Sequence, residues 1–341
     1  MPERLLIVGP AWVGDMVMSQ SLLMTLAARN PDAALDVLAP AWSLPLLRRM
    51  PEVSEAIKMP LGHGEFGFSV RRRLGRSLRD RDYRQAIVLP RSMKSALVPF
   101  FAGVPRRTGY RGEMRFGLLN DIRALDTARL TRTVQRYVAL GRPAGADQPP
   151  PVPEPRLQTD AANQQRLLRD LDLKTDRPIV AIMPGAEYGP AKCWPLDKYA
   201  QVAAALAADG YQVWILGSDR DAGAGEFIHH SAGCAALNLC GRTRLVDAVD
   251  LLALAERAVT NDSGLMHVAA AVGCHVIALY GSSTPDYTPP LSDRKTVFYL
   301  SLDCSPCFKR TCPLGHLRCL HEITPEMVLD AFAGSENRAR A

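Results

Sequence analysis

The sequence predicts an α/β protein made of two doubly wound, Rossmann-like domains that face a cleft. Three observations support this prediction. Short apolar runs of strand length alternate with helix-length segments along the chain, as in parallel sheets covered by helices. A run at 143–155 holds six prolines and divides the pattern into two halves, since such a run is neither a helix nor a central strand. The length of 341 residues also favours two domains over one.

The N-terminal half, residues 1–155, begins with an all-apolar strand at 5–8, the kind that a parallel sheet buries on both faces. A turn through residues 9–15 then leads into a helix from about Met16 to Arg29. The further elements that we expect in this half are strands at 35–38, 56–59 and 85–89, helices at 41–50 and 69–79, and a helix that opens at 91–94.

The pattern restarts in residues 156–341. We expect helices at 161–171 and 196–208, the second closed by Gly210, and strands at 179–183, 213–216, 237–239, 258–260 and 276–279. Doubly wound sheets bind ligands outside the carboxyl ends of their strands. The turns that follow these strands are therefore where a site is expected.

The stretch Thr-Asn-Asp-Ser-Gly-Leu-Met-His at 260–267 follows a predicted buried strand and leads into a helix rich in small residues, which Gly273 is placed to close. The first N–H groups of a helix are unpaired and, with the helix dipole, form an anion site. Gly264 lets the backbone approach a ligand closely, and His267 can point at the same ligand. The alternative is an Asp or Ser N-cap followed by a buried histidine.

The loop Pro-Gly-Ala-Glu-Tyr-Gly-Pro-Ala-Lys-Cys-Trp-Pro at 184–195 follows another predicted strand and carries one cation, Lys192. An ammonium group at the carboxyl end of a strand suits a diphosphate leaving group. Because Lys192 lies on a loop, its truncation is expected to open no core cavity and to cost little stability. The alternative is a solvated surface lysine.

Gly9 and Gly14 have the spacing of a phosphate-binding loop, but Asp15 stands where such a loop has lysine. A carboxylate repels phosphate, so this turn is expected to face a neutral hydroxyl group, with Asp15 as a general base. The alternative is that Asp15 is only an N-cap or a first-turn acid of the helix.

Charge is unevenly distributed along the chain. Residues 1–150 hold 23 Lys and Arg against 13 Asp and Glu, whereas the remainder holds 18 against 22. The basic half suits an anionic partner: a phosphorylated substrate, a membrane surface or a nucleic acid. Aromatic residues are only 6% of the chain and no basic–aromatic motif is present, so no nucleic-acid partner is expected. One basic cluster either contacts membrane phosphates or forms a solvated face: Arg71, Arg72, Arg73, Arg76 and Arg79.

No apolar run approaches the ~20 residues of a membrane span, and the short apolar N-terminus lacks the cleavage site of a signal peptide. We therefore expect a cytoplasmic protein with reduced cysteines. Four of the eight cysteines lie in the tail, at Cys304, Cys307, Cys312 and Cys319. Their spacing leaves open a metal site, a disulfide in an oxidised sample, and reduced packing cysteines.

Three motifs in chain order resemble the heptosyltransferases of glycosyltransferase family 9: Gly-Asp-Met at 14–16, the loop at 184–195, and Asn-Asp-Ser-Gly-Leu-Met-His at 261–267. Arg-Ser-Met-Lys-Ser-Ala at 91–96 and Gly-Val-Pro-Arg-Arg-Thr-Gly at 103–109 share this resemblance. The resemblance spans nearly the whole chain. It implies the GT-B fold, with an acceptor-binding domain at 1–155 that ends in the proline-rich linker, and an ADP-sugar-binding domain at 156–341. It also implies inversion at the anomeric carbon, with no essential cofactor or catalytic metal.

The resemblance further implies ADP-heptose as the donor of L-glycero-D-manno-heptose. The implied acceptor is a phosphorylated Kdo-lipid A core that already carries one heptose. The enzyme would be cytoplasmic, with peripheral contact to the cytoplasmic face of the inner membrane. The alternatives are an enzyme that adds the first heptose, a GT-B enzyme for another sugar nucleotide, and a basic nucleic-acid-binding or regulatory protein with a metal-binding tail.

By the same resemblance, Asp15 is the base that deprotonates the acceptor hydroxyl, and Lys192 is the cation that neutralises the departing ADP diphosphate. Further acceptor contacts are expected from Gly14, Met16, Arg91 and Lys94. Donor contacts are expected from Gly185, Ala186, Glu187, Asp262, Ser263, Gly264, Leu265, Met266 and His267. An adenine or ribose contact is expected near residues 218–221.

Overall fold

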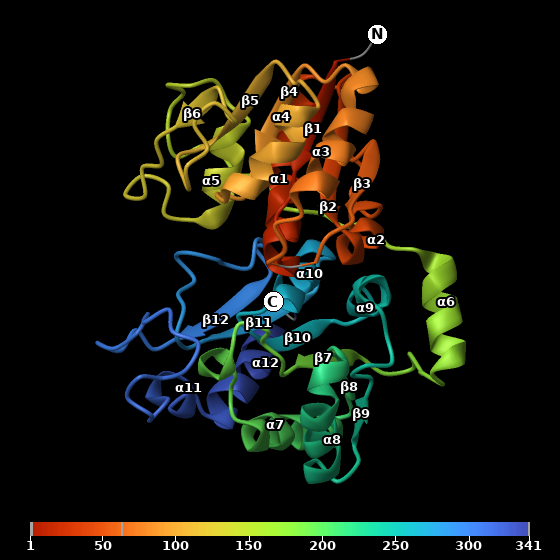
Figure 1. Cartoon of the computed structure of the whole chain (residues 1–341). Helices are drawn as coiled ribbons and strands as arrows, with labels where there is room; N and C mark the ends of the chain where they lie inside the picture. The colour runs from red at the N-terminus through yellow and green to blue at the C-terminus, as the bar shows by residue number, and fades with distance from the viewer. Residues whose placement is uncertain (1–2, 63, 340–341) are drawn as a thin grey trace. The chain divides into compact units, whose positions relative to one another are not determined.

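The computed structural model of the chain describes residues 3–62 and 64–339. It divides into two compact units, Met1–Arg156 and Leu157–Ala341, whose colours in Figure 1 run from red to yellow and from green to blue. Each unit contains one six-stranded sheet. The paired strands are parallel and are accompanied by helices, which is the doubly wound α/β arrangement that the alternating pattern predicts.

In the N-terminal unit the strand order is β3-β2-β1-β4-β5-β6, so the order reverses between β1 and β4. This is the order of Rossmann folds, and the reversal is where such sheets bind ligands. The strands are β1 Arg4–Val8, β2 Ala34–Pro40, β3 Glu55–Met59, β4 Gln85–Val88, β5 Arg106–Tyr110 and β6 Asp121–Arg123. The helices are α1 Val13–Arg29, α2 Leu44–Leu47, α3 Phe68–Ser77, α4 Leu97–Phe101 and α5 Thr133–Leu140, with 3₁₀ turns η1 Ala41–Ser43, η2 Arg79–Arg81 and η3 Met93–Ala96.

The C-terminal unit repeats this arrangement with the order β12-β11-β10-β7-β8-β9, which reverses between β7 and β10. Its strands are β7 Ile179–Met183, β8 Gln212–Ile215, β9 Ala236–Asn238, β10 Arg257–Asn261, β11 His275–Tyr280 and β12 Lys295–Tyr299. Its helices are α6 Ala161–Asp170, α7 Leu196–Ala208, α8 Ala222–Ser231, α9 Leu245–Leu252, α10 Gly264–Ala271, α11 Arg318–His321 and α12 Pro325–Ala339, with 3₁₀ turns η4 Pro190–Lys192 and η5 Asp219–Asp221.

The central strands of the sheets lie in the hydrophobic core. Every residue of β7 and of β10 is buried. Removing apolar surface from water stabilises the fold by about 25 cal/mol per Å², which is why a buried strand such as β7 is an apolar run in the sequence. Within residues 3–62 and 64–339, no helix is long and apolar enough to cross a membrane.

All the predicted strands are confirmed, with ends that shift by two residues at most. The structure adds β5, β6 and β12, which the sequence analysis missed. β5 opens with two arginines, while β6 and β12 lie at sheet edges and are only partly buried. Strands buried on fewer faces need no apolar run, so their pattern is weak.

Three helix predictions are corrected. α1 begins at Val13, not near Met16, so Gly14 and Asp15 lie in its first turn. The predicted helix at 41–50 is the 3₁₀ turn η1 followed by the short α2, because Pro45 has no N–H to donate to Ala41 O, and Leu44 N bonds that oxygen instead. The segment 91–94 does not open a helix: η3 begins only at Met93, and α4 follows it.

The proline-rich segment 143–155 contains neither helix nor strand. Its end is fixed along α1. Ser21 Oγ donates to Pro153 O at 2.6 Å, and the Gln20 amide bonds both the backbone O and the backbone N of Arg156, at 2.8 and 3.0 Å. The chain therefore leaves the N-terminal unit along a defined path.

Candidate functional site

Lys192 and Asp262 meet where the strand order of the C-terminal unit reverses. Lys192 lies in the loop after β7, and Asp262 directly follows β10, the neighbouring strand. Lys192 Nζ donates to Asp262 Oδ2 at 2.5 Å. Ser283 Oγ donates to the same oxygen at 2.5 Å, and Thr288 Oγ1 donates to Oδ1 at 3.4 Å. The buried carboxylate therefore fixes the direction of the ammonium group.

This ion pair corrects three expectations. The Lys192 side chain is only 17% exposed, so it is not a solvated surface lysine. Both carboxylate oxygens of Asp262 already accept hydrogen bonds, and an anion does not bind an anion, so Asp262 holds Lys192 rather than the donor phosphate. Truncation of Lys192 would leave a buried carboxylate without its cation, so the loss of stability is larger than a loop position suggests.

Asn261, the last residue of β10, joins the two ends of the loop that carries Lys192. Its side chain is fully buried. Nδ2 donates to Pro184 O at 2.6 Å, and Oδ1 accepts from Trp194 N at 2.9 Å and from the Tyr199 hydroxyl at 3.0 Å. The sequence analysis gave Asn261 no role. Its signal was an amide side chain at the carboxyl end of a strand that was predicted to be buried.

The ring of Tyr188, in the same loop, contacts two cations. Lys192 Nζ lies 5.1 Å and Arg310 Cζ lies 5.4 Å from the centroid of the Tyr188 ring. The Tyr188 hydroxyl donates to Phe308 O at 2.7 Å, and Ala191 N donates to Arg310 O at 3.0 Å. The cysteine-rich segment thus braces the loop and adds Arg310, a residue that the sequence analysis did not predict.

α10 begins beside the Lys192–Asp262 pair. Its N-cap, Ser263, makes no side-chain hydrogen bond to the helix, so the first N–H groups, those of Gly264, Leu265 and Met266, have no acceptor within it. The sequence motif at 260–267 predicts that these N–H groups bind an anion. The Met266 side chain is buried against Tyr280, whose hydroxyl lies 3.5 Å from its sulfur, so Met266 offers a ligand only its backbone.

His267 is buried one turn into α10, and within the part of the chain that the structure describes its Nδ1 has no hydrogen-bond partner. Burial, together with the nearby Lys192 ammonium, lowers the pKa of His267 to about 4, although Asp262 acts in the opposite direction. His267 is therefore neutral at pH 7. An unpaired buried nitrogen is costly, and it suits a place where a ligand supplies the missing partner.

We expect His267→Gln to remove part of the acid sensitivity of folding. The unfolded histidine has its ordinary pKa of 6.5 and the folded one a pKa of about 4, so between these values only the unfolded state binds the proton. The stability from the neutral imidazole is complete above pH 6.5 and is lost towards pH 4, on the order of 3 kcal/mol. Urea unfolding of both proteins across this range measures the difference. Parallel pH profiles would contradict it.

The predicted donor contacts at 185–187 pack against the turn after β8. A Cβ on Gly185 would collide with the Asp221 carboxylate, so only glycine allows this approach. Ala186 O accepts from Gly189 N at 3.2 Å, which closes the loop locally. Glu187 forms an exposed ion pair with Arg220. Within the turn, Asp221 is held by Ser218, whose N and Oγ donate to it at 2.8 and 2.7 Å.

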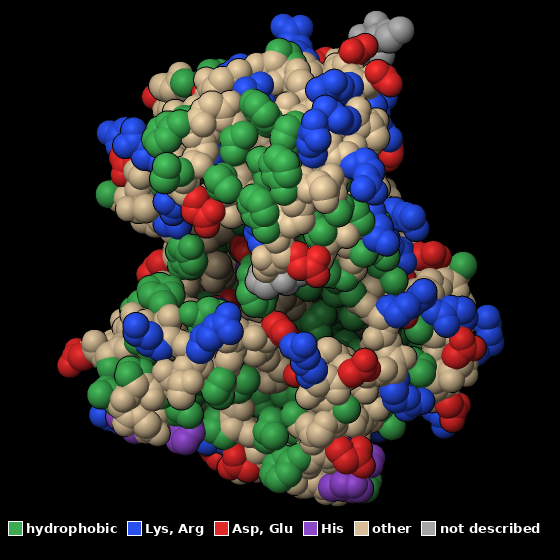
Figure 2. Space-filling model, viewed as in Figure 1, with side chains coloured by type: hydrophobic (Ala, Val, Ile, Leu, Met, Phe, Trp, Pro, Cys, Tyr) green, Lys and Arg blue, Asp and Glu red, His purple; other side chains and the backbone are tan. Residues whose placement is uncertain are grey.

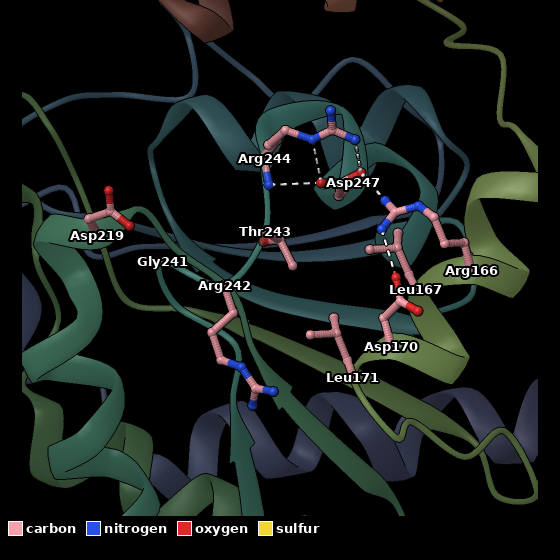
Figure 3. A pocket seen from close by; sticks show the side chains of 10 residues that line it. All are labelled: Arg166, Leu167, Asp170, Leu171, Asp219, Gly241, Arg242, Thr243, Arg244 and Asp247. Atoms are coloured by element: carbon pink, nitrogen blue, oxygen red, sulfur yellow. Dashed lines mark hydrogen bonds and ion pairs between the residues drawn. The ribbon is translucent and has the colours of Figure 1, made fainter.

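A polar pocket of about 820 Å³ lies next to this turn, beyond the carboxyl ends of β8 and β9. Figure 3 shows the residues that line it. Asp219 lines it from the turn after β8, and a Cβ on Gly241 would lie 2.7 Å from Asp219 Oδ1, so the glycine allows their close approach. The other lining residues are Arg166, Leu167, Asp170, Leu171, Arg242, Thr243, Arg244 and Asp247. The volume is that of a pocket for a small ligand.

Two of the arginines that line this pocket form ion pairs with Asp247. Arg244 and Arg166 both point at Asp247, with N–O distances of 2.9 and 3.2 Å. Burial alone would raise the pKa of Asp247, but hydrogen bonds from Arg244 and Asn163 lower it to about 2. Arg242 extends separately from the loop after β9 (Figure 3).

The predicted acceptor residues lie at the reversal of the N-terminal sheet. Asp15 and Gly14 follow β1, and Arg91 follows β4, the neighbouring strand, so they share one sheet edge. Lys94 Nζ donates to Glu65 O at 3.3 Å. Met16 is corrected: its side chain is fully buried and its N–H donates to Trp12 O at 2.9 Å, so it faces the core rather than a substrate.

Arg71 is also corrected. Its guanidinium is buried and donates to the backbone oxygens of Phe66, Lys94 and Glu65 at 2.7, 3.2 and 3.2 Å. Arg71 therefore ties the start of α3 to η3 and is not available to membrane phosphates. Arg72, Arg73 and Arg76, on the same helix, are exposed.

None of the eight cysteines, all of which lie in the described part of the chain, forms a disulfide. In the tail, Cys319 is buried, and Cys304, Cys307 and Cys312 are half-buried. Backbone N–H groups of residues 314–317, that of Leu317 foremost, hydrogen-bond the Cys312 sulfur and lower the pKa of its thiol.

Comparison with known proteins gives matches over nearly the whole chain. Residues 71–318 match the model of the protein family described as "Glycosyltransferase family 9 (heptosyltransferase)". Lipopolysaccharide heptosyltransferase 2 of Salmonella typhimurium is 50% identical over 338 residues, which are 96% of this chain and 97% of that protein. Lipooligosaccharide heptosyltransferase 2 of Haemophilus influenzae is 47% identical, with the same coverage.

The fold comparison is equally extensive. The solved structure of Escherichia coli ADP-heptose LPS heptosyltransferase II matches with a TM-score of 0.87 at 46% identity, covering 99% of this chain and 100% of that one. The GT-B fold that the resemblance implies is thereby confirmed, and the hypothesis of a non-enzymatic regulator is not supported. The chain belongs to glycosyltransferase family 9, the heptosyltransferases, and is a glycosyltransferase.

Proposed function

We propose that this chain transfers L-glycero-D-manno-heptose from ADP-heptose, with inversion, to the first heptose of a phosphorylated Kdo-lipid A core. The names of its relatives support this reaction, since they are heptosyltransferases 2 and one is described as acting with ADP-heptose. The observation that carries the proposal is the Lys192 ammonium, which buried Asp262 fixes beside the start of α10. A cation next to free helix N–H groups is a site for a diphosphate.

On the donor side, the bond between the anomeric carbon and the phosphate oxygen breaks, and its electron pair stays on ADP. Lys192 meets the charge that develops on the leaving oxygen, while the N–H groups of Gly264, Leu265 and Met266 bind the phosphates. Arg310, which contacts the same Tyr188 ring as Lys192, adds to the positive field. Neutral His267 donates to the same ligand, which satisfies its buried nitrogen.

We place the nucleoside of the donor in the polar pocket beyond β8 and β9. That pocket lies at the same edge of the sheet as Lys192, because β8 is the neighbour of β7, and β9 is the next strand. Asp219 is the acceptor for ribose hydroxyls there, since Asp221 is already bonded to Ser218. Gly185 and Ala186 approach from the neighbouring loop, and Glu187 orients Arg220 at the rim.

On the acceptor side, Asp15 removes the proton from the attacking hydroxyl group, whose oxygen forms the new bond to the anomeric carbon. The first turn of α1 holds the carboxylate, and Gly14 allows the acceptor to approach the backbone. Arg91 and Lys94, beyond the neighbouring strand, bind phosphates of the inner core. A basic N-terminal half suits this anionic acceptor.

The test is an assay with ADP-heptose and with cores that carry no heptose or one. Transfer only to the core with one heptose supports the proposal. Transfer to the core without heptose would instead indicate an enzyme that adds the first heptose. Stabilisation by UDP but not ADP in a melting experiment would point to another sugar nucleotide.

We expect Asn261→Ala to impair the reaction through the loop that it joins. The variant leaves Pro184 O and Trp194 N without partners, so the unfolding free energy falls by roughly 2–4 kcal/mol, and displacement of Lys192 lowers the single-turnover rate up to about 100-fold. Tyr199→Phe is the matched control, because it removes a hydrogen bond to Asn261 and leaves the loop ends joined. Equal rates in the two variants, measured well below their melting temperatures, would contradict the positioning role.

We further propose that no divalent ion is required. Lys192, Arg310 and the start of α10 supply the positive charge that the diphosphate needs. Turnover is therefore expected to be unchanged after treatment with a chelator, and unchanged when Mg²⁺ is restored. Loss of activity on chelation, with recovery on adding one metal, would contradict this.

The enzyme is proposed to work in the cytoplasm, in peripheral contact with the inner membrane. Figure 2 shows hydrophobic side chains gathered on the N-terminal unit near α3 and α4, with Lys and Arg beside them. We call this the aromatic–basic surface, and its residues are the exposed Phe66, Phe68, Phe100, Arg72, Arg73 and Arg76. Exposed aromatics next to cations suit an anionic bilayer surface.

Co-sedimentation with vesicles tests this contact. Wild-type protein is expected to bind vesicles that contain anionic lipid more than neutral ones, and less at high salt. The double variant Phe66→Ser/Phe68→Ser should lose most of that binding, whereas Phe227→Ser, an exposed aromatic of the other unit, should not. Equal binding by both variants would remove the aromatic–basic surface from the proposal while leaving the heptosyl transfer intact.

A further inference from the structure

Two adjacent histidines end helix α8, and a cysteine follows in the turn that leads to β9. One ring nitrogen each of His229 and His230, and the sulfur of Cys234, lie within 4.8 Å of one another. Within residues 3–62 and 64–339, no other three or more His, Cys, Asp or Glu side chains lie close enough together to bind one metal ion. The four tail cysteines therefore do not form such a group. The sequence analysis looked for a metal only in the tail.

Each histidine is already oriented by its other ring nitrogen. His229 Nδ1 lies 2.6 Å from Ala236 O, and since a carbonyl only accepts, Nδ1 carries the hydrogen and Nε2 keeps its lone pair. His230 Nε2 lies 2.8 Å from the Glu226 carboxylate, and His230 Nδ1 lies 3.9 Å from Cys234 Sγ. Metal-binding histidines are held in this way, by a carbonyl or a carboxylate on the far nitrogen.

The supporting groups are themselves held. The Asn238 amide donates to Glu226 at 3.2 Å, which connects the carboxylate to β9. Cys234 N donates to His229 O at 2.9 Å, and the backbone of Cys234 has a left-handed φ of 62°. That turn brings the thiol back over the end of α8, where the partial negative charge of the helix terminus favours a cation.

We propose that His229, His230 and Cys234 bind one divalent transition metal of the zinc type, with Glu226 as a positioning residue. Two imidazoles and a thiolate are ligands that zinc and cobalt prefer, whereas Mg²⁺ and Ca²⁺ prefer oxygen. On binding, the thiol loses its proton to solvent and the sulfur forms the metal bond. His230 and Cys234 are exposed, so water completes the coordination.

The position of this metal site in the fold indicates that the ion would stabilise the structure. α8 precedes β9, so its end lies at the amino edge of the sheet, opposite to the carboxyl edge that carries Lys192 and Asp262. The ion would tie the end of α8 to the turn before β9 and would stabilise the folded chain by mass action. Turnover is not expected to depend on it.

Cobalt titration of the metal-stripped, reduced full-length protein tests the site. We expect one equivalent of Co²⁺ to produce a thiolate-to-cobalt charge-transfer absorption, and Zn²⁺ to displace it and raise the melting temperature. Cys234→Ser should abolish the absorption. Glu226→Gln should keep the stoichiometry and weaken the affinity about 10–100-fold, as losses of such positioning groups do.

The tail cysteines provide the control, since they too can bind cobalt. The variant Cys304→Ser/Cys307→Ser is expected to keep the Cys234-dependent absorption. An absorption that persists in Cys234→Ser, that disappears only in the tail variant, or that needs a large excess of cobalt would overturn the proposal. All the substituted side chains are at least partly accessible, so the variants are expected to fold.

Discussion

Lys192→Ala is expected to lower the single-turnover rate at saturating ADP-heptose by about 10²–10³-fold, as the loss of one preorganised charge-stabilising donor does. Breaking the sugar–phosphate bond places extra negative charge on ADP, and helix α10 supplies only a partial positive charge at its start. A full cation held at a fixed position lowers the barrier because its attraction grows as the charge develops. Arg at this position would recover only part of the rate, since its planar fork differs from a compact ammonium.

The same substitution is expected to lower the melting temperature, because the Asp262 carboxylate is buried and loses its cation. The double variant Lys192→Ala/Asp262→Asn separates the two effects. Its neutral amide can accept from Ser283 through the oxygen and donate through the nitrogen to the Thr288 hydroxyl, so stability should return towards the wild-type value while the rate stays low. If the rate returned with the stability, Lys192 would be structural and the leaving-group assignment would fail.

Asp15→Asn is expected to lower turnover by ~10²–10⁴-fold, the usual contribution of a general base. The amide keeps the size of the side chain and removes the basic oxygen, so the acceptor hydroxyl loses its proton acceptor. Stability should fall by much less than the barrier rises, since the amide keeps a hydrogen-bonding oxygen and the helix dipole contributes about 0.3–1 kcal/mol for a first-turn acid. Binding of ADP should be unaffected.

Three measurements decide the role of Asp15: the single-turnover rate, ADP binding by melting shift, and the pH dependence of the rate. A base predicts that the wild-type rate falls on acidification and that the residual rate of Asp15→Asn lacks this acid limb. Near-normal turnover in the variant, with a small stability loss, would leave Asp15 as a helix-terminus residue and nothing more.

Much of the fold could be predicted from sequence because its signals are local. The strands β1 and β7 contain short apolar runs that helices must cover, and each is followed by a turn whose residues differ from the rest of the chain. The motif around Asp262 could be assigned to a helix start for the same reason. Partly buried edge strands such as β12 escaped because a side chain that stays half in water need not be apolar.

The sequence by itself determined the two α/β halves, the family resemblance and the segments after buried strands that carry Asp15, Lys192 and His267. Only the tertiary structure decided what those side chains touch. Asp262 pairs with Lys192, Asn261 joins the ends of a distant loop, Arg310 contacts that loop from the tail, and the Met16 side chain lies in the core. The physical reason is that these contacts depend on which strands become neighbours. Strand order is set by the packing of the whole sheet, whereas hydrophobic periodicity and turn residues report only on each segment.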